Sequence, residues 1–111
     1  MKMEKVYNKL VRDNIPNIIK NNGGEPFTRI LNDEEYKMEL EKKLYEEYNE
    51  VLNTKSTEDR IEELADMVEI ISALAVVENK SLDDVIECAK KKSIKRGGFE
   101  KKIYLEKVIE D

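Results

Sequence analysis

The apolar positions of this 111-residue chain recur with a helical period over most of its length. From residue 32 or 33 to about residue 53, four apolar side chains fall on one face, as in an amphipathic helix: Tyr36, Leu40, Leu44 and Val51. Ser56, with Asp59 three residues later, resembles a capping box and predicts the start of a second helix that ends near Glu78. The latter half of that helix is almost wholly apolar, which predicts that neighbours enclose it on most sides.

Two further helices are predicted on either side of this pair. Ser81 and Asp84 repeat the cap signature, and the helix that they open is expected to end at Gly97-Gly98. Near the start of the chain, residues 15–20 read as a short helix with Pro16 in its first turn.

Two short segments have the composition of strands. Residues 27–31 are partly β-branched or aromatic and lie between turn residues, and the weak alternation around residues 102–106 suggests a partner strand. We therefore expect a mostly α fold, an antiparallel helical bundle with a short two-stranded β element, in a single domain over residues 1–111.

Composition narrows the possible functions. Charged residues make up 41% of the chain with a net charge of −5, so we expect no binding to nucleic acid. A single cysteine, no apolar signal segment and no transmembrane run predict a cytoplasmic protein without a membrane partner. With no histidine, His/Cys zinc sites and Ser-His-Asp triads are excluded within one chain. The thin core expected of such a charged chain predicts a homo-oligomer, a dimer or a tetramer.

Four carboxylates lie on faces that should be apolar. At about 100° per residue, Glu47 projects into the middle of the apolar arc of the first long helix, and Glu50 lies at its edge. Glu63 and Asp66 lie on one of the two apolar stripes of the second long helix. An unpaired carboxylate that faces a core costs several kcal/mol, so each needs a proton, a cation or a metal ion.

The short connection between the two long helices makes them an antiparallel hairpin, which brings both acidic pairs toward one place. A divalent cation relieves their repulsion, and Mg²⁺ prefers a few carboxylates together with water and phosphate oxygens. The alternative is that Glu47 pairs with Lys43 one turn earlier and that Asp66 merely flanks the loop.

The spacing Glu47-x-x-Glu50, followed by Glu63-x-x-Asp66, resembles the paired acidic motif of the MazG-like all-α nucleoside triphosphate pyrophosphohydrolases. The segments 7–16 and 95–99 also look like the opening and closing segments of a house-cleaning subgroup of that superfamily. Together these segments span nearly the whole chain.

This resemblance implies Mg²⁺-dependent hydrolysis of a nucleoside triphosphate between the α and β phosphates. The substrate can be a canonical or a noncanonical nucleotide. Mn²⁺ is expected to be able to replace Mg²⁺. The resemblance implies metal ligation by the four carboxylates, with Glu47 or Glu50 as the general base. Six further residues are expected to bind the substrate. Lys92, Arg96, Lys9 and Arg12 are expected to bind the phosphates, and Asn8 and Tyr48 are expected to bind the nucleoside.

Two other functions are compatible with the same pattern. One is a phosphoribosyl-ATP pyrophosphohydrolase of histidine synthesis, which shares the fold and the cleavage position. The other is a non-catalytic helical module that senses a nucleotide or binds a protein. The opening segment favours the house-cleaning enzyme, and a substrate panel separates the three.

Overall fold

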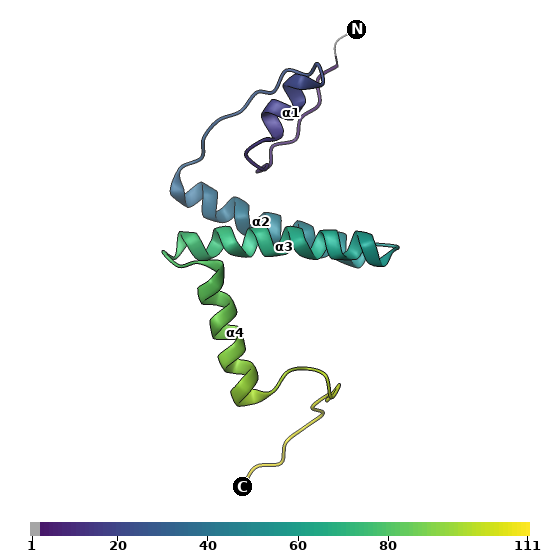
Figure 1. Ribbon diagram of the computed structural model, residues 1–111, viewed down its shortest axis with the longest axis vertical. Coiled ribbons are helices and arrows are strands. Elements are labelled where there is room, and N and C mark those ends of the chain that lie inside the picture. Colours follow the sequence, from purple (N-terminus) through teal and green to yellow (C-terminus); the bar gives the residue numbers. More distant parts are fainter. Residues whose placement is uncertain (1–2) are drawn as a thin grey trace.

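The computed structural model describes residues 3–111, and these residues form four helices and no strand. The helices are α1 (Ile15–Asn21), α2 (Asp33–Leu52), α3 (Thr57–Val77) and α4 (Leu82–Arg96). Helices α2 and α3 form an antiparallel hairpin, and α4 runs crosswise from the far end of α3 (Figure 1). The mostly α class and the positions of all the predicted helices are confirmed.

The helices begin where the capping residues predict. Side chains at the N-caps of the three long helices accept a hydrogen bond from the backbone N–H three residues later: Asn32, Ser56 and Ser81. At Ser81 the contact is reciprocal, because the Asp84 carboxylate accepts from the Ser81 N–H at 2.8 Å. Gly97, with a φ of 84°, follows the last residue of α4, in the left-handed region that glycine adopts at low cost.

The core lies along the line of contact between α2 and α3. Only four apolar residues of residues 3–111 are buried: Leu40, Val51, Ile70 and Ala75. Helix α4 packs on α3, and α1 packs against none of the other helices. The expected antiparallel packing therefore holds for the α2–α3 hairpin, while α4 projects away from one end of it (Figure 1).

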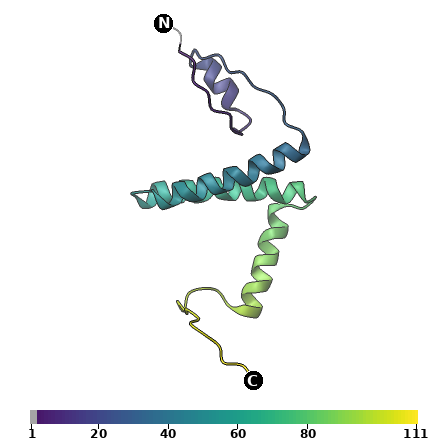
Figure 2. The same ribbon diagram turned by 180° about the vertical axis from the view of Figure 1, so that it is seen from behind.

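The predicted β element is wrong. Residues 27–31 and 102–106 have no strand conformation, and Phe27, Ile30 and Ile103 are largely exposed. The N-terminal part lies on one side of the α2–α3 hairpin, and α4 with the C-terminal tail lies on the other (Figures 1 and 2). The hairpin separates the two segments, so neither can donate backbone hydrogen bonds to the other.

The four helices can be compared with the length and apolar character of membrane-spanning helices. None of them, within residues 3–111, combines the length and the apolar character that spanning a bilayer requires.

Candidate metal centre

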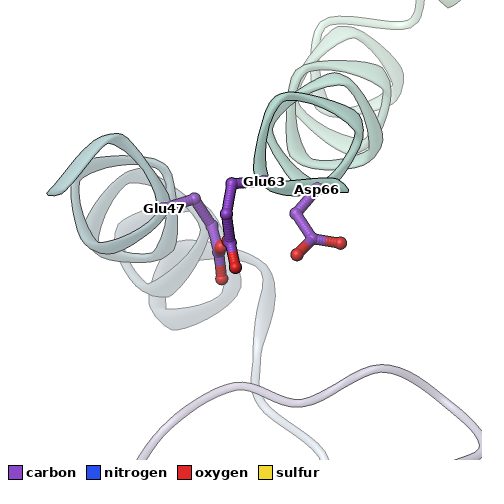
Figure 3. A group of neighbouring side chains, drawn as sticks. All are labelled: Glu47, Glu63 and Asp66. Atoms are coloured by element: carbon purple, nitrogen blue, oxygen red, sulfur yellow. The ribbon is translucent and has the colours of Figure 1, made fainter. Parts of the chain in front are cut away.

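Three of the four predicted carboxylates meet between α2 and α3. Glu47 comes from α2, Glu63 and Asp66 come from α3, and one oxygen of each lies within 4.8 Å of the others. Figure 3 shows the three side chains projecting into the same space between the two helices. All three are half-buried. We call Glu47, Glu63 and Asp66 the acidic cluster.

The crowding of the acidic cluster changes the proton affinity of Glu47. Burial, a hydrogen bond with Glu63 and the negative charges of Asp66 and Glu63 raise the pKa of Glu47 to about 7, and Lys43 partly opposes this. Near neutral pH the Glu47 carboxyl group is therefore partly protonated, because like charges at short range disfavour its ionised form.

The N-terminal segment supplies basic side chains next to these acids. The Arg12 guanidinium donates from Nη2 to Oδ1 of Asp66 at 2.7 Å. The Lys9 ammonium lies 3.5 Å from Oε1 of Glu46, one residue before Glu47. The segment 7–16, singled out by sequence, is thus held on the hairpin beside the acidic cluster by two ion pairs.

The donor set fits a hard divalent cation. Oxygens that share one Mg²⁺ lie at most about 4.2 Å apart, which is twice a metal–oxygen distance of about 2.1 Å. The separations of up to 4.8 Å in the acidic cluster need only small side-chain shifts to reach that limit. Half-buried ligands also leave room for the water and phosphate oxygens that Mg²⁺ retains.

The other predicted site residues lie outside the acidic cluster. Glu50 is exposed one turn after Glu47, and Tyr48 packs against Tyr45 with ring centroids 6.5 Å apart. Asn8 is exposed beside Lys9 and has a φ of 46°.

The predicted basic pair of α4 is also separate from the acidic cluster. Lys92 borders a hollow on α4, and Arg96 borders a second hollow formed with residues 97–103. Helix α4 extends away from the hairpin on the side opposite the N-terminal segment (Figure 1). Within one chain, Lys9 and Arg12 are therefore the predicted phosphate-binding residues that lie nearest to the acids.

Several contacts were not predicted, and the Arg12–Asp66 pair described above is one of them. Glu46, expected to be an ordinary solvated acid, pairs with Lys9, and Lys43 lies 3.9 Å from Glu46 instead of pairing with Glu47. Arg60 donates from Nη1 to the carbonyl oxygen of Val51 at 3.1 Å, which ties the start of α3 to the end of α2. The Lys9–Glu46 pair joins residues that are 37 positions apart, and the Arg60–Val51 bond joins residues that are 9 positions apart. Local spacing therefore gave no signal for either contact.

Comparison of the chain with protein-family models, with curated proteins and with solved structures finds no match.

Proposed function

We propose that this protein is a divalent-cation-dependent hydrolase that cleaves a nucleoside triphosphate between the α and β phosphates. The proposal depends above all on the acidic cluster, in which three carboxylates from two helices lie within 4.8 Å of one another. A cluster of this kind between facing helices is how helical bundles hold metal ions. The resemblance of the paired acidic motif supplies the reaction and the substrate class.

The chemistry divides between the cation and the chain. When bound, Mg²⁺, or Mn²⁺ in its place, neutralises phosphate oxygens and lowers the pKa of an attacking water. Glu47, Glu63 and Asp66 would hold the cation, and exposed Glu50 follows Glu47 by one turn of α2. A carboxylate accepts the proton of the water as its oxygen bonds to phosphorus, and the α–β anhydride bond breaks to release the nucleoside monophosphate and pyrophosphate.

Glu47 and Glu50 are the two candidates for the general base. The raised pKa of Glu47 arises from burial and neighbouring carboxylates, and a bound cation opposes that effect. Glu50 is exposed and outside the acidic cluster, so it stays available to accept a proton. Glu50→Gln and Glu47→Gln separate the roles, because loss of the base lowers the turnover number and loss of a ligand also weakens metal binding.

Basic residues of the chain complete the proposal. Arg12 and Lys9 lie beside the acids, where they can pair with phosphate oxygens once a cation occupies the carboxylates. Lys92 and Arg96 border hollows on α4 and after it, apart from the acidic cluster, so their phosphate-binding role stays a prediction. The nucleoside contacts of Asn8 and Tyr48 stay predictions as well. The homo-oligomer and a cytoplasmic location remain predictions.

One observation favours a second candidate function. Arg12 already neutralises Asp66 at 2.7 Å, so the acidic cluster is partly compensated without any metal. This is what a non-catalytic helical module needs. A phosphoribosyl-ATP pyrophosphohydrolase shares the proposed site and differs in substrate alone.

Pyrophosphate release from a panel of canonical and damaged nucleoside triphosphates tests the proposal. We expect release in the presence of Mg²⁺ and its loss with a chelator. Asp66→Asn should lower the rate at least about 100-fold, because the cation that stabilises the charge of the transition state loses a ligand. The matched control is Glu62→Gln, which removes an exposed acid from the same helix and should leave the rate within about twofold.

The possible outcomes are distinct. Release that persists with chelator and in Asp66→Asn contradicts the metal centre. No release from the panel leads next to phosphoribosyl-ATP as the substrate. If phosphoribosyl-ATP also gives no pyrophosphate, the result supports the non-catalytic module.

A further inference from the structure

The guanidinium of Arg12 is the cation in direct contact with the acidic cluster. It donates from Nη2 to Oδ1 of Asp66 at 2.7 Å, and Asp66 is one of the three carboxylates whose oxygens lie within 4.8 Å of one another. Among the ion pairs of residues 3–111, this is the one that involves a member of the acidic cluster. Arg12 therefore already compensates a carboxylate that a metal ion would need.

Arg12 and a divalent cation compete for Asp66. A metal ion on either oxygen of that carboxylate would lie well inside the screening length of about 10 Å from the guanidinium. The two positive groups would repel each other, and a carboxylate that binds a doubly charged ion attracts a second cation less strongly. Metal binding at the acidic cluster therefore weakens the Arg12–Asp66 pair.

The same pair attaches the N-terminal part of the chain, residues 3–32, to the α2–α3 hairpin. A second ion pair joins Lys9 to Glu46 at 3.5 Å, outside the acidic cluster, and α1 packs against none of the other helices. The side chains of both pairs are 39–58% exposed, so each pair is weak in water. Weakening one of two such links shifts the N-terminal part toward a detached state.

We propose that a divalent cation displaces Arg12 from Asp66 and thereby loosens the N-terminal part from the hairpin. This inference rests on the proposed function, because it takes the acidic cluster to be the binding site of the cation. Without metal, Arg12 compensates Asp66 and attaches the N-terminal part. With metal bound, the guanidinium is available to an anion such as phosphate. The N-terminal part thus responds to the metal before any nucleotide binds.

Thermodynamic linkage makes the competition reciprocal. If metal binding loosens the N-terminal part by some factor, the attached N-terminal part weakens metal binding by the same factor. A partly exposed ion pair limits that factor to about fivefold. Loss of the Arg12 guanidinium should therefore tighten metal binding, although arginine is not a metal ligand.

Hydrogen exchange of the wild type tests the loosening without any nucleotide. We compare backbone exchange in residues 3–32 in chelator, in saturating MgCl₂ and in KCl of the same ionic strength. We expect exchange up to about fivefold faster in MgCl₂ than in KCl. Asp66→Asn should show no difference between the two salts, because it has lost both the pair with Arg12 and a metal ligand.

Calorimetric titration with MgCl₂ tests the reciprocal effect. We expect Arg12→Gln to bind Mg²⁺ up to about fivefold more tightly than the wild type. The matched control is Arg29→Gln, which removes the same charge from an exposed pair with Glu35 at 3.1 Å. Glu35 precedes Glu47 by about 18 Å along α2, beyond the screening length of about 10 Å. Arg29→Gln should therefore keep the wild-type affinity within about twofold.

Several results would overturn the displacement of Arg12. They are exchange in residues 3–32 that is no faster in MgCl₂ than in KCl, an equal acceleration in Asp66→Asn, and an Arg12→Gln that binds Mg²⁺ no more tightly than Arg29→Gln. The wild-type exchange decides the question if Arg12→Gln fails to fold. Mg²⁺ that binds without loosening the N-terminal part overturns the displacement alone, and an absence of Mg²⁺ binding overturns the proposed function as well. Pyrophosphate release reports on the function separately.

Discussion

Glu47 lies where burial and crowding act on one carboxyl group. It is half-buried between α2 and α3, and burial together with the neighbouring Glu63 and Asp66 raises its pKa to about 7. The unfolded chain releases this proton near pH 4.5. Between these two values the folded state binds more protons than the unfolded state, so raising the pH through that window disfavours folding.

The stability of the metal-free protein should therefore depend on Glu47. Its favourable contribution is complete below about pH 4.5 and is lost as the pH rises to about 7. With chelator present, we expect Glu47→Gln to raise the free energy of unfolding by about 1 kcal/mol at about pH 8 and to change it little at about pH 5, allowing for solvent screening. Urea unfolding at the two pH values measures this, with exposed Glu41→Gln as the control. Equal effects of the two variants would contradict the assignment.

The α2–α3 hairpin depends on its turn and on the cap of α3. Thr54 and Arg60 both donate to the carbonyl oxygen of Val51, at 2.8 and 3.1 Å, and so satisfy the end of α2. The Ser56 hydroxyl accepts from the Asp59 N–H at 3.1 Å and begins α3. Because α3 carries Glu63 and Asp66, these local bonds fix the register in which the acidic cluster forms.

Loss of the α3 cap should weaken the hairpin. We expect Ser56→Ala to lower the free energy of unfolding by about 1 kcal/mol, because the Asp59 N–H loses its acceptor. Urea unfolding followed by circular dichroism measures the loss. Ser93→Ala, in the exposed interior of α4, is the control and should be neutral or slightly stabilising. An unchanged free energy of unfolding in Ser56→Ala would contradict this role of the cap.

The whole molecule consists of parts joined by few contacts. Helix α1 packs against no other helix, and the ion pairs Lys9–Glu46 and Arg12–Asp66 join the N-terminal part to the hairpin. Both pairs are between partly exposed side chains, so each contributes about 0–1 kcal/mol and is weakened by salt. The N-terminal part should therefore detach at a lower cost than global unfolding.

Hydrogen exchange tests this weak attachment. We expect Arg12→Gln to speed backbone exchange in residues 3–32 by up to about fivefold, as loss of about 1 kcal/mol predicts. High salt should have the same effect on the wild type and little further effect on the variant. Lys42→Gln removes an exposed ion pair within α2 and serves as the control. Unchanged exchange in Arg12→Gln would mean that other contacts hold the segment.

The four helices could be predicted from the sequence because their signals are local. Caps at Asn32, Ser56 and Ser81 lie within three residues of their partners, and the spacing of the acids with a short turn was enough to bring Glu47, Glu63 and Asp66 together. The other features depend on how distant parts of the chain are arranged in space. The segments 27–31 and 102–106 have strand-like composition, but they lie on opposite sides of the hairpin (Figure 1).

Two more features could not be predicted from the sequence: the acid that Arg12 contacts and the stripe of α3 that α2 covers. Arg12 meets Asp66 across 54 residues of sequence, and no periodicity encodes which acid a distant cation reaches. Both stripes of α3 are apolar, so composition could not tell that α2 covers the one with Ile70 and leaves the one with Leu64 exposed. That choice depends on the rotation of one helix against another, which packing of the folded chain sets.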